Sequence, residues 1–307
     1  MILKFIYKNV SYYKGLLERA LNFIKKRVSI VVVCLLFISL IFSAYFFKKI
    51  HISNQINSIA KLQTILKKSK YDLWSIRQKK KKVPRIFIKY FPKDFDTIKN
   101  KFQRKNIFIQ VVLPLILKVN EEITFERQKL IQIKYKLQNK IALKTYELRF
   151  LKQVSEKYKV YHNNIDELLS KVDVIPVSLA LAQAIQETGW GSSYFLLNGN
   201  SLFAEWTWKS DGMIPRAREK NLRHRIKTFS TLIESVRSYA MILNSSKYYK
   251  YFRKTRKTLS KVENKIHNGI SLSSTMKYYS TTPEYLFLVN KIIDKNFLTD
   301  FDLSELE

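Results

Sequence analysis

A carboxylate at the end of an apolar helix is the side chain best suited to chemistry in this sequence. Residues 175–191 read IPVSLALAQAIQETGWG and are apolar on nearly every side except Gln183, which predicts a short helix inside a core. Glu187 falls in the last turn, and Gly189 can leave the helix with a positive φ. Burial and the negative end of the helix dipole both disfavour the charged form, so we expect the raised pKa that a general acid needs. The alternative is a solvated glutamate at a helix end.

Other elements must position this carboxylate. We expect Ser178 to be the N-cap of the short helix. From about residue 107 to 152 an apolar stripe, broken only at Pro114, predicts two helices or one kinked helix that brace the catalytic part. Thr231–Glu234 is a capping box that opens another helix, and a turn signal in residues 206–229 predicts a small antiparallel lobe. The sequence therefore predicts a mainly α protein with a small β lobe, an α+β fold.

Two linked motifs resemble the glucosaminidase domain of bacterial peptidoglycan hydrolases. Residues 187–191 (ETGWG) match the family's Glu-(Ser/Thr)-Gly-Trp-Gly block, and residues 198–204 (NGNSLFA) match the Asn-Asn-Leu-Phe-Gly that follows it. This sequence departs from the second motif at Ser201, where the family has Asn, and at Ala204, where it has Gly. Both changes are small, so they bear on the floor of the cleft more than on the chemistry.

The resemblance extends upstream to about residue 83 and downstream to about residue 298. Segments 83–94 and 113–123 look like the region that precedes the glucosaminidase domain in bacterial Bax-like proteins, which are unrelated to the apoptosis regulator of that name. The resemblance implies a lysozyme-like domain that hydrolyses a β-1,4 glycosidic bond after N-acetylglucosamine, with Glu187 as general acid. The side chains that we expect to contact the glycan are Trp190, Asn200, Phe203, Trp206, Tyr239 and Tyr285.

Two of these side chains also have a purely structural interpretation. Trp206 either stacks on a sugar ring or closes the core of the small lobe. Tyr239 either contacts the substrate and Glu187 or is a core tyrosine. The sequence alone leaves both alternatives open.

Glycoside hydrolysis ordinarily uses a second carboxyl group. The small lobe offers three: Glu205, Asp211 and Glu219. Asp211 is explained by its Asp-Gly turn, and Glu205 can point to either face of a strand. In related domains a second Glu commonly lies thirty to forty residues after the first, which favours Glu219. Its basic neighbours would keep it ionised as a base or oxocarbenium stabiliser, although Glu219 can equally well balance a basic loop.

Metal-dependent and serine-dependent chemistry find little support in the sequence. The four histidines, His51, His162, His224 and His267, lie far apart without paired ligand spacing, and Cys34 is the single cysteine. No serine has the Gly-x-Ser-x-Gly setting of a nucleophile elbow. We expect no metal and no cofactor, which argues against a zinc-dependent amidase.

The net charge of +32 is spread unevenly. Residues 1–150 carry 33 Lys and Arg against 8 Asp and Glu, whereas the rest of the chain carries 23 against 16. Such a balance suits nucleic acid, anionic lipid or an acidic wall polymer. No nucleic-acid-binding motif accompanies the charge, so we expect no nucleic-acid partner.

Residues 28–47 contain no charged residue, glycine or proline and are long enough to span the ~30 Å hydrocarbon layer as a helix. We expect an uncleaved transmembrane anchor, because the apolar run is longer than that of a signal peptide. The resemblance implies a single-pass protein of the bacterial inner membrane whose catalytic domain faces the periplasm or wall. The predicted divisions are a cytoplasmic N-terminus (1–27), the anchor (28–47), a basic stalk with bracing helices (48–150) and the catalytic domain (151–298).

The expected function is hydrolysis of peptidoglycan strands by an endo-β-N-acetylglucosaminidase. A muramidase or lytic transglycosylase is the alternative enzyme, since the residues do not specify the bond. A wall-binding anchor without catalysis is the alternative from another class, and Ser201 and Ala204 would fit such a protein.

Overall fold

The computed structural model describes residues 37–39, 56, 58–161, 164–210, 212–215, 218, 222–263 and 269–307. The chain divides into two compact units, Met1–Gln55 and Ile56–Glu307. The predicted anchor, residues 28–47, lies outside the described residues apart from 37–39. Within the residues that are described, no helix combines the length and apolarity needed to cross a membrane.

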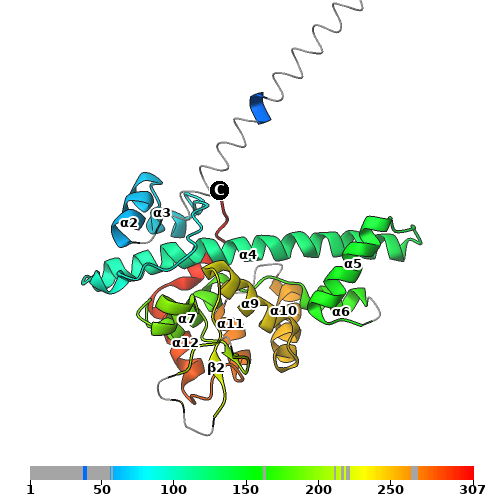
Figure 1. Cartoon of the computed structure of the whole chain (residues 1–307). Coiled ribbons are helices and arrows are strands. Elements are labelled where there is room, and N and C mark those ends of the chain that lie inside the picture. Colours follow the sequence, from blue (N-terminus) through cyan, green and yellow to red (C-terminus); the bar gives the residue numbers. More distant parts are fainter. Residues whose placement is uncertain are drawn as a thin grey trace, which may run out of the picture. The chain divides into compact units, whose positions relative to one another are not determined.

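One long helix, α4 (Lys101–Gln138), forms the spine of the unit (Figure 1). It begins at Asn100, whose side chain accepts a hydrogen bond from the Gln103 amide at 3.0 Å. Pro114 lies inside the helix without ending it, so one continuous helix takes the place of the predicted pair. Nearly every side chain between Ile107 and Val119 is buried, because α4 packs against α6 (Ile165–Lys171), α7 (Val177–Thr188) and α9 (Leu232–Ser245).

Helix α7 is the buried helix that the sequence predicts, but Ser178 is not its N-cap. The cap position is Pro176, which makes no side-chain cap hydrogen bond. The Ser178 amide and hydroxyl instead donate to the two carboxylate oxygens of Asp302, at 2.8 and 2.7 Å. A carboxylate from the far end of the chain therefore caps α7, as suits the positive end of a helix dipole.

Asn120 of α4 fixes the segment that enters α7. Its side-chain amide donates to the Ile175 carbonyl at 2.8 Å and its carbonyl accepts from the Ile175 amide at 3.1 Å. At the other end, Gly189, Trp190 and Gly191 all have positive φ. A Cβ on Gly191 would lie 2.7 Å from the Phe95 ring, so only glycine fits this turn. Both ends of α7 are thus held, and the direction of Glu187 is fixed with them.

The small lobe follows α8 (Tyr194–Gly199) and contains a two-stranded antiparallel sheet. Strand β1 (Trp206–Thr207) pairs with β2 (Arg225–Ile226), with Trp206 opposite Ile226. An isolated bridge between Met213 and Ile226 extends the pairing. The prediction of a mainly α protein with a small β lobe is confirmed; the lysozyme-like arrangement remains a prediction.

The predicted capping box opens α9, where the Thr231 hydroxyl accepts from the Glu234 amide at 3.4 Å. The last α-helix of the described residues, α12, begins at Tyr285. The remaining α-helices are α2 (Ile59–Lys68), α3 (Leu73–Arg77), α5 (Thr145–Tyr158), α10 (Lys250–Glu263), α11 (Gly269–Ser273) and α12 (Tyr285–Lys295).

Residues on both sides of position 150 belong to the same compact unit. Ion pairs fasten α4 to neighbouring segments: Glu121 pairs with Arg85 at 2.7 Å, and Glu122 pairs with Arg237 of α9 at 2.7 Å. These carboxylates form ion pairs, as expected for glutamates among lysines. The functional boundary near residue 150 stays a prediction.

Candidate active site

A cleft of about 590 Å³ lies beside the C-terminal end of α7. Glu187 lines it from α7, Glu205 and Trp206 from the small lobe, and Tyr239 from α9. Tyr279, from the segment before α12, also lines it. Four separate parts of the sequence thus meet at one cleft, and the side chains named here are all aromatic or carboxylic.

Glu187 is half-buried, and burial raises the pKa of its carboxyl group to about 7. A hydrogen bond from Tyr285 acts in the opposite direction by stabilising the ionised form. The raised pKa agrees with the sequence-based expectation, with burial as the dominant cause. A carboxyl group with this pKa is still partly protonated at neutral pH, so it can donate a proton.

A chain of hydrogen bonds leads to Glu187 from inside the core. The Tyr239 hydroxyl donates to Gln183 Oε1 at 2.6 Å, and Gln183 Nε2 donates to the Tyr285 hydroxyl at 2.9 Å. Tyr285 then hydrogen-bonds Glu187. Each donor points toward the carboxylate, because Gln183 receives through its oxygen and donates through its nitrogen. Gln183, the polar exception in the apolar helix, is buried and links the two tyrosines.

Stacked aromatic rings support this chain. Phe203 and Tyr239 stack with centroids 3.9 Å apart, and Tyr279 stacks on Tyr285 at 5.6 Å. The Tyr279 hydroxyl donates to the Phe203 carbonyl at 3.0 Å. Packing of this kind restricts the tyrosine rings to one arrangement and so restricts the carboxyl group that they contact.

Glu205 is a second buried carboxyl group in the cleft, and burial raises its pKa to about 7. Its side chain is only 4% exposed, and its Oε1 has no hydrogen-bond partner among the described residues. Oε2 accepts from the Ser238 hydroxyl at 2.7 Å and lies 3.7 Å from Lys227 Nζ. A buried carboxyl oxygen without a partner is costly, so it calls for a functional explanation.

The predicted contact residues divide into two groups. Phe203, Trp206 and Tyr239 line the cleft, and Tyr285 lies behind Glu187. Tyr239 and Phe203 are also core residues, at 1% exposure each, whereas Trp206 is 52% exposed and stacks on His224. An exposed indole at the rim of a cleft is available to a sugar ring.

Trp190 and Asn200 do not belong to the cleft lining, contrary to our expectation. The Trp190 ring packs edge-on against Phe108 of α4, with Lys105 Nζ 4.7 Å from the ring centre. Asn200 adopts a left-handed conformation at the end of α8, and its side chain donates to the Phe229 carbonyl at 3.0 Å. Both residues therefore hold loops in place, because the side chain of Trp190 packs on α4 and that of Asn200 is bonded to the backbone at Phe229.

Glu219 lies outside the described residues, and so does Asp211. Sequence reasoning gave Glu205 a low rank because a two-residue strand has no pattern that tells which face is buried. The predicted contact residues did not include two further side chains that line the cleft: Trp208, which is 73% exposed, and Tyr279. In the part of the chain that is described, no three His, Cys, Asp or Glu side chains are grouped as metal ligands would be.

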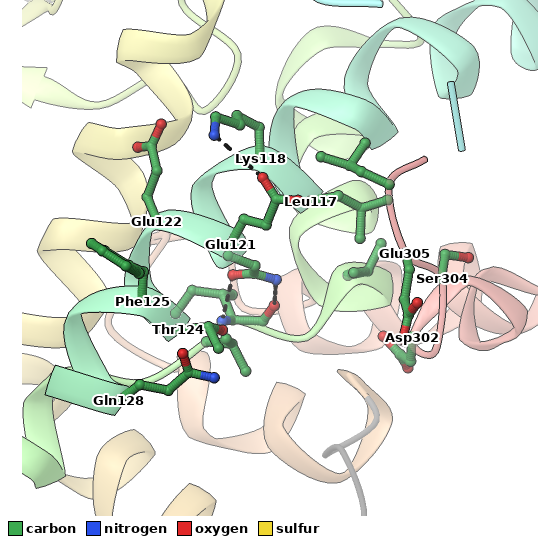
Figure 2. Close-up of a pocket in the computed structure, with 15 residues that line it drawn as sticks. Leu117, Lys118, Glu121, Glu122, Thr124, Phe125, Gln128, Asp302, Ser304 and Glu305 are labelled. Carbon is green, nitrogen blue, oxygen red and sulfur yellow. Dashed lines mark hydrogen bonds and ion pairs between the residues drawn. The ribbon is translucent and has the colours of Figure 1, made fainter. Parts of the chain in front are cut away.

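A larger hollow of about 760 Å³ lies between α4 and the C-terminal segment (Figure 2). It contains several carboxylates, but their charges are engaged. Glu121 pairs with Arg85, and Asp302 caps α7. Glu305 pairs with Lys82 at 2.9 Å. This hollow therefore has a structural explanation, and the smaller cleft contains the candidate chemistry.

Comparison with known proteins identifies relatives of part of the chain. Residues 162–298 match the glucosaminidase family, described as mannosyl-glycoprotein endo-beta-N-acetylglucosaminidase. Protein bax from Escherichia coli (strain K12) is 34% identical over 187 residues, which cover 58% of this chain and 64% of that protein. Exo-glucosaminidase LytG from Bacillus subtilis (strain 168) is 26% identical over 143 residues, which cover 44% of this chain and 49% of that protein. The chain thus matches less than two thirds of either relative's length.

Among solved structures, the catalytic domain of the autolysin Auto from Listeria monocytogenes is 19% identical and aligns over 56% of this chain and 96% of that chain. Its TM-score of 0.30 is too low to support an argument about the fold. The family match begins within the predicted catalytic range 151–298 and ends at the same residue. It contains α7, the small lobe, α9 and all of α12, which together line or support the cleft. Residues 162–298 therefore resemble a glucosaminidase domain, and this likeness supports a glycoside hydrolase.

Proposed function

We propose that this chain hydrolyses peptidoglycan by cutting the β-1,4 bond on the reducing side of N-acetylglucosamine within the glycan strand. One observation carries the proposal: two carboxyl groups, half-buried Glu187 and buried Glu205, both with pKa about 7, line one cleft with exposed tryptophans. Glycosidases ordinarily use such a pair, one protonated and the other ionised. The family match supports the class of bond.

Glu187 is the general acid in this proposal and protonates the glycosidic oxygen as the bond breaks. Burial keeps the proton on the carboxyl group until the leaving oxygen becomes basic. After the transfer, Glu187 is an anion at the negative end of α7. The hydrogen bond from Tyr285 stabilises that anion, and the chain through Gln183 and Tyr239 orients the Tyr285 hydroxyl.

Glu205 is the second carboxyl group that the cleft itself contains. Ser238 and Lys227 favour its ionised form, while burial opposes it. Because the pKa of each carboxyl group is about 7, the two together retain about one proton near neutral pH. Ionised Glu205 would stabilise the positive charge that develops on the sugar. Glu219 remains the competing candidate for this role, on the sequence argument given above.

The anchor completes the proposal. Residues 28–47 would hold the protein in the bacterial inner membrane as a single-pass protein, with the catalytic domain on the periplasmic side, where peptidoglycan lies. A phosphatase-type reporter fused to the C-terminus should be active there. A C-terminus that proteases cannot reach in right-side-out cells would contradict this orientation.

The test of the activity uses the full chain in detergent on purified sacculi. The full chain is needed because α4 supplies part of the core that covers α7 and α9. Released fragments are reduced with borohydride and identified by mass spectrometry. We expect reduced N-acetylglucosamine at the new ends, and internal cleavage gives a broad distribution of chain lengths.

Other products select other functions. Reduced N-acetylmuramic acid would indicate a muramidase, and an anhydro end would indicate a lytic transglycosylase. Sugars released one unit at a time would indicate exo action, which the name of the B. subtilis relative states for that protein. Binding to sacculi without any release would indicate a wall-binding anchor.

A further inference from the structure

A third hollow, which we call the basic groove, adjoins the candidate active site. It has a volume of about 1090 Å³ and is formed mainly by α10 and the segment that precedes it. Tyr248 and Tyr278 line both the basic groove and the cleft that holds Glu187. A ligand bound in the cleft can therefore continue into the groove past these two tyrosines.

Four lysines give the groove its charge: Lys247, Lys250, Lys254 and Lys257. The last three recur at i, i+4 and i+7 and so lie on one face of α10. No carboxylate among the described residues forms an ion pair with any of the four. Glu167, the single acidic residue of the lining, pairs with Lys171 at 2.9 Å. This concentration is unusual for the chain, because residues 151–307 carry 23 basic against 16 acidic residues.

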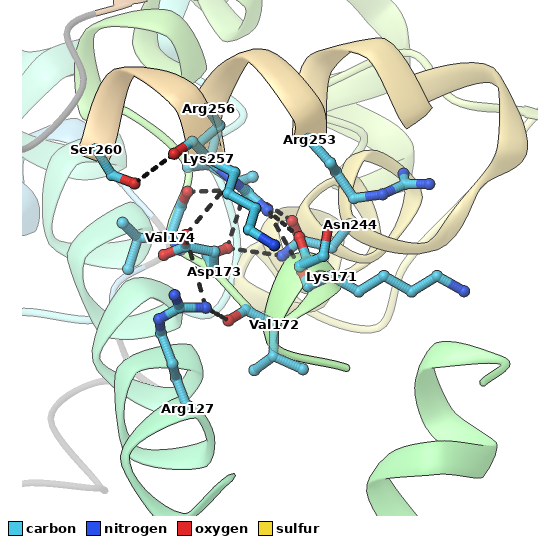
Figure 3. Close-up of polar contacts among 12 residues, drawn as sticks. Arg127, Lys171, Val172, Asp173, Val174, Asn244, Arg253, Arg256, Lys257 and Ser260 are labelled. Carbon is cyan, nitrogen blue, oxygen red and sulfur yellow. Dashed lines mark hydrogen bonds and ion pairs between the residues drawn. The ribbon is translucent and has the colours of Figure 1, made fainter. Parts of the chain in front are cut away.

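The groove rests on a firmly attached helix (Figure 3). Arg256 is fully buried and donates to the carbonyls of Asp173 and Val174 and to Asn244 Oδ1, at 2.8 to 3.1 Å. Arg253 donates to the carbonyls of Leu243 and Ser246, both at 2.9 Å. These two arginines are occupied in fastening α10, whereas the four lysines form no ion pair within 4.0 Å among the described residues; Lys247 Nζ lies 5.4 Å from the centre of the Tyr248 ring. The charge in the groove is thus held ready for a ligand rather than used for folding.

We propose that the basic groove binds the carboxylates of the peptide stem on the glycan strand whose sugars occupy the cleft. This proposal rests on the proposed function. Neutral sugar rings do not account for four unpaired cations, whereas the stem peptide carries several carboxylates and is attached to a sugar of the same strand. Exposed tyrosines among the lysines, Tyr248 at 59% and Tyr251 at 64%, supply surface for the peptide's apolar parts.

Kinetics with two glycan substrates test the proposal. One substrate retains its stem peptides, and the other has been stripped of them by an amidase. In the groove variant, Lys250→Gln, Lys254→Gln and Lys257→Gln are combined. We expect its KM for the peptide-bearing glycan to rise about tenfold with kcat nearly unchanged, because exposed ion pairs contribute to binding in ground state and transition state alike. Its KM for the stripped glycan should not change.

A control variant has the same change of charge at exposed lysines outside both hollows: Lys99→Gln, Lys101→Gln and Lys152→Gln. It should resemble the unmodified protein on both substrates. Equal losses on both glycans in the groove variant would overturn the proposal, since the groove would then act on the sugars or on folding. A loss in the control variant equal to that of the groove variant would overturn it too, because net charge alone would explain the effect.

A binding measurement separates this proposal from the proposed function. The free stem tetrapeptide, released by an amidase, is titrated into the full chain with Glu187→Gln and into the same chain carrying the groove variant. We expect the tetrapeptide to bind the Glu187→Gln chain, and to bind about tenfold more weakly when that chain also carries the groove variant. This result does not require the protein to cleave glycan. Binding of a glycerol-phosphate polymer or of anionic lipid vesicles without binding of the tetrapeptide would overturn the assignment.

Discussion

The two sides of the candidate active site hold their carboxyl groups in different ways. On the helical side, Glu187 ends a chain of hydrogen bonds in which every donor points toward it. On the small-lobe side, Glu205 has one oxygen bonded to Ser238 and the other without a partner among the described residues. A carboxyl group that a packed chain of hydrogen bonds orients suits a fixed proton donor. A buried carboxyl oxygen without a hydrogen-bond partner is electrostatically unfavourable, and a bound substrate can supply the missing partner.

The backbone differs between the two sides as well. Glu187 lies in regular helix, whereas the small lobe has positive φ at two non-glycine residues, Asn200 and Ala204. Asparagine tolerates the left-handed region of backbone conformation, but alanine does not favour it. Trp190, directly after α7, also has a positive φ, so left-handed backbone at non-glycine residues occurs on both sides; the difference is that Glu187 itself lies in regular helix. The comparison indicates that the acid is fixed by packing, while the second carboxyl group depends on a less regular support.

The largest effect is expected from Glu187→Gln, which preserves shape and removes the proton. Turnover of sacculi should fall ~10²-fold or more, because general acid catalysis contributes about that much. The rate of fragment release measures it, and circular dichroism checks that the fold is intact. A folded variant with nearly normal turnover would show that the helical side does not supply the acid.

The second effect concerns stability and pH. The pKa of Glu205 is raised from 4.5 to about 7 in the folded protein, so the folded state binds this proton more tightly than the unfolded state. Stability is therefore lost as pH rises from about 4.5 to 7 and stays low above it. Glu205→Gln removes this loss and should unfold with a free energy ~2 kcal/mol higher than the unmodified chain at pH 8.

At pH 4 the same variant should show no such advantage, since both states of the unmodified chain are then protonated. Urea unfolding at the two pH values measures the difference. If Glu205→Gln raises the free energy of unfolding equally at pH 4 and pH 8, the ionisation of Glu205 is not the cause of the increase.

The third effect decides between the two small-lobe carboxylates. Glu205→Gln should lower turnover about tenfold, since stabilisation of the developing sugar cation is lost while the acid remains. Glu219→Gln is the matched variant. If turnover falls with Glu219→Gln and not with Glu205→Gln, the sequence-based assignment is right and Glu205 is structural. If neither variant changes turnover, the mechanism is substrate-assisted or uses Glu187 alone.

A smaller effect is expected from Tyr285→Phe. The variant removes the hydrogen bond that lowers the pKa of Glu187, so that pKa should rise above about 7. Because the acid must be protonated, activity is lost as pH rises through its pKa. The upper limb of the kcat profile should therefore move to higher pH, with a few-fold lower maximum. An unshifted limb would mean that Tyr285 does not act on the acid.

The smallest effect is expected from Ala204→Gly. Relief of the left-handed conformation should raise the free energy of unfolding by ~1 kcal/mol, with turnover unchanged. Thermal unfolding measures it. A destabilised variant would show that the small lobe is not strained at this residue.

The sequence alone determined the features that depend on local pattern. The apolar run of α7 predicts its burial, and its last turn locates Glu187 and predicts the raised pKa. Thr231 and Glu234 predict the start of α9 in the same way. These predictions succeeded because helix periodicity and capping involve residues within a few positions of each other.

Only the tertiary structure decided the features that join distant segments. Asp302 lies 124 residues after Ser178 yet caps its helix. Trp190 belongs to the family motif but is turned toward α4 by contact with Phe108, 82 positions earlier. Glu205 became a candidate only when the cleft brought it together with Glu187, because a two-residue strand carries too little pattern to predict which side chains are buried.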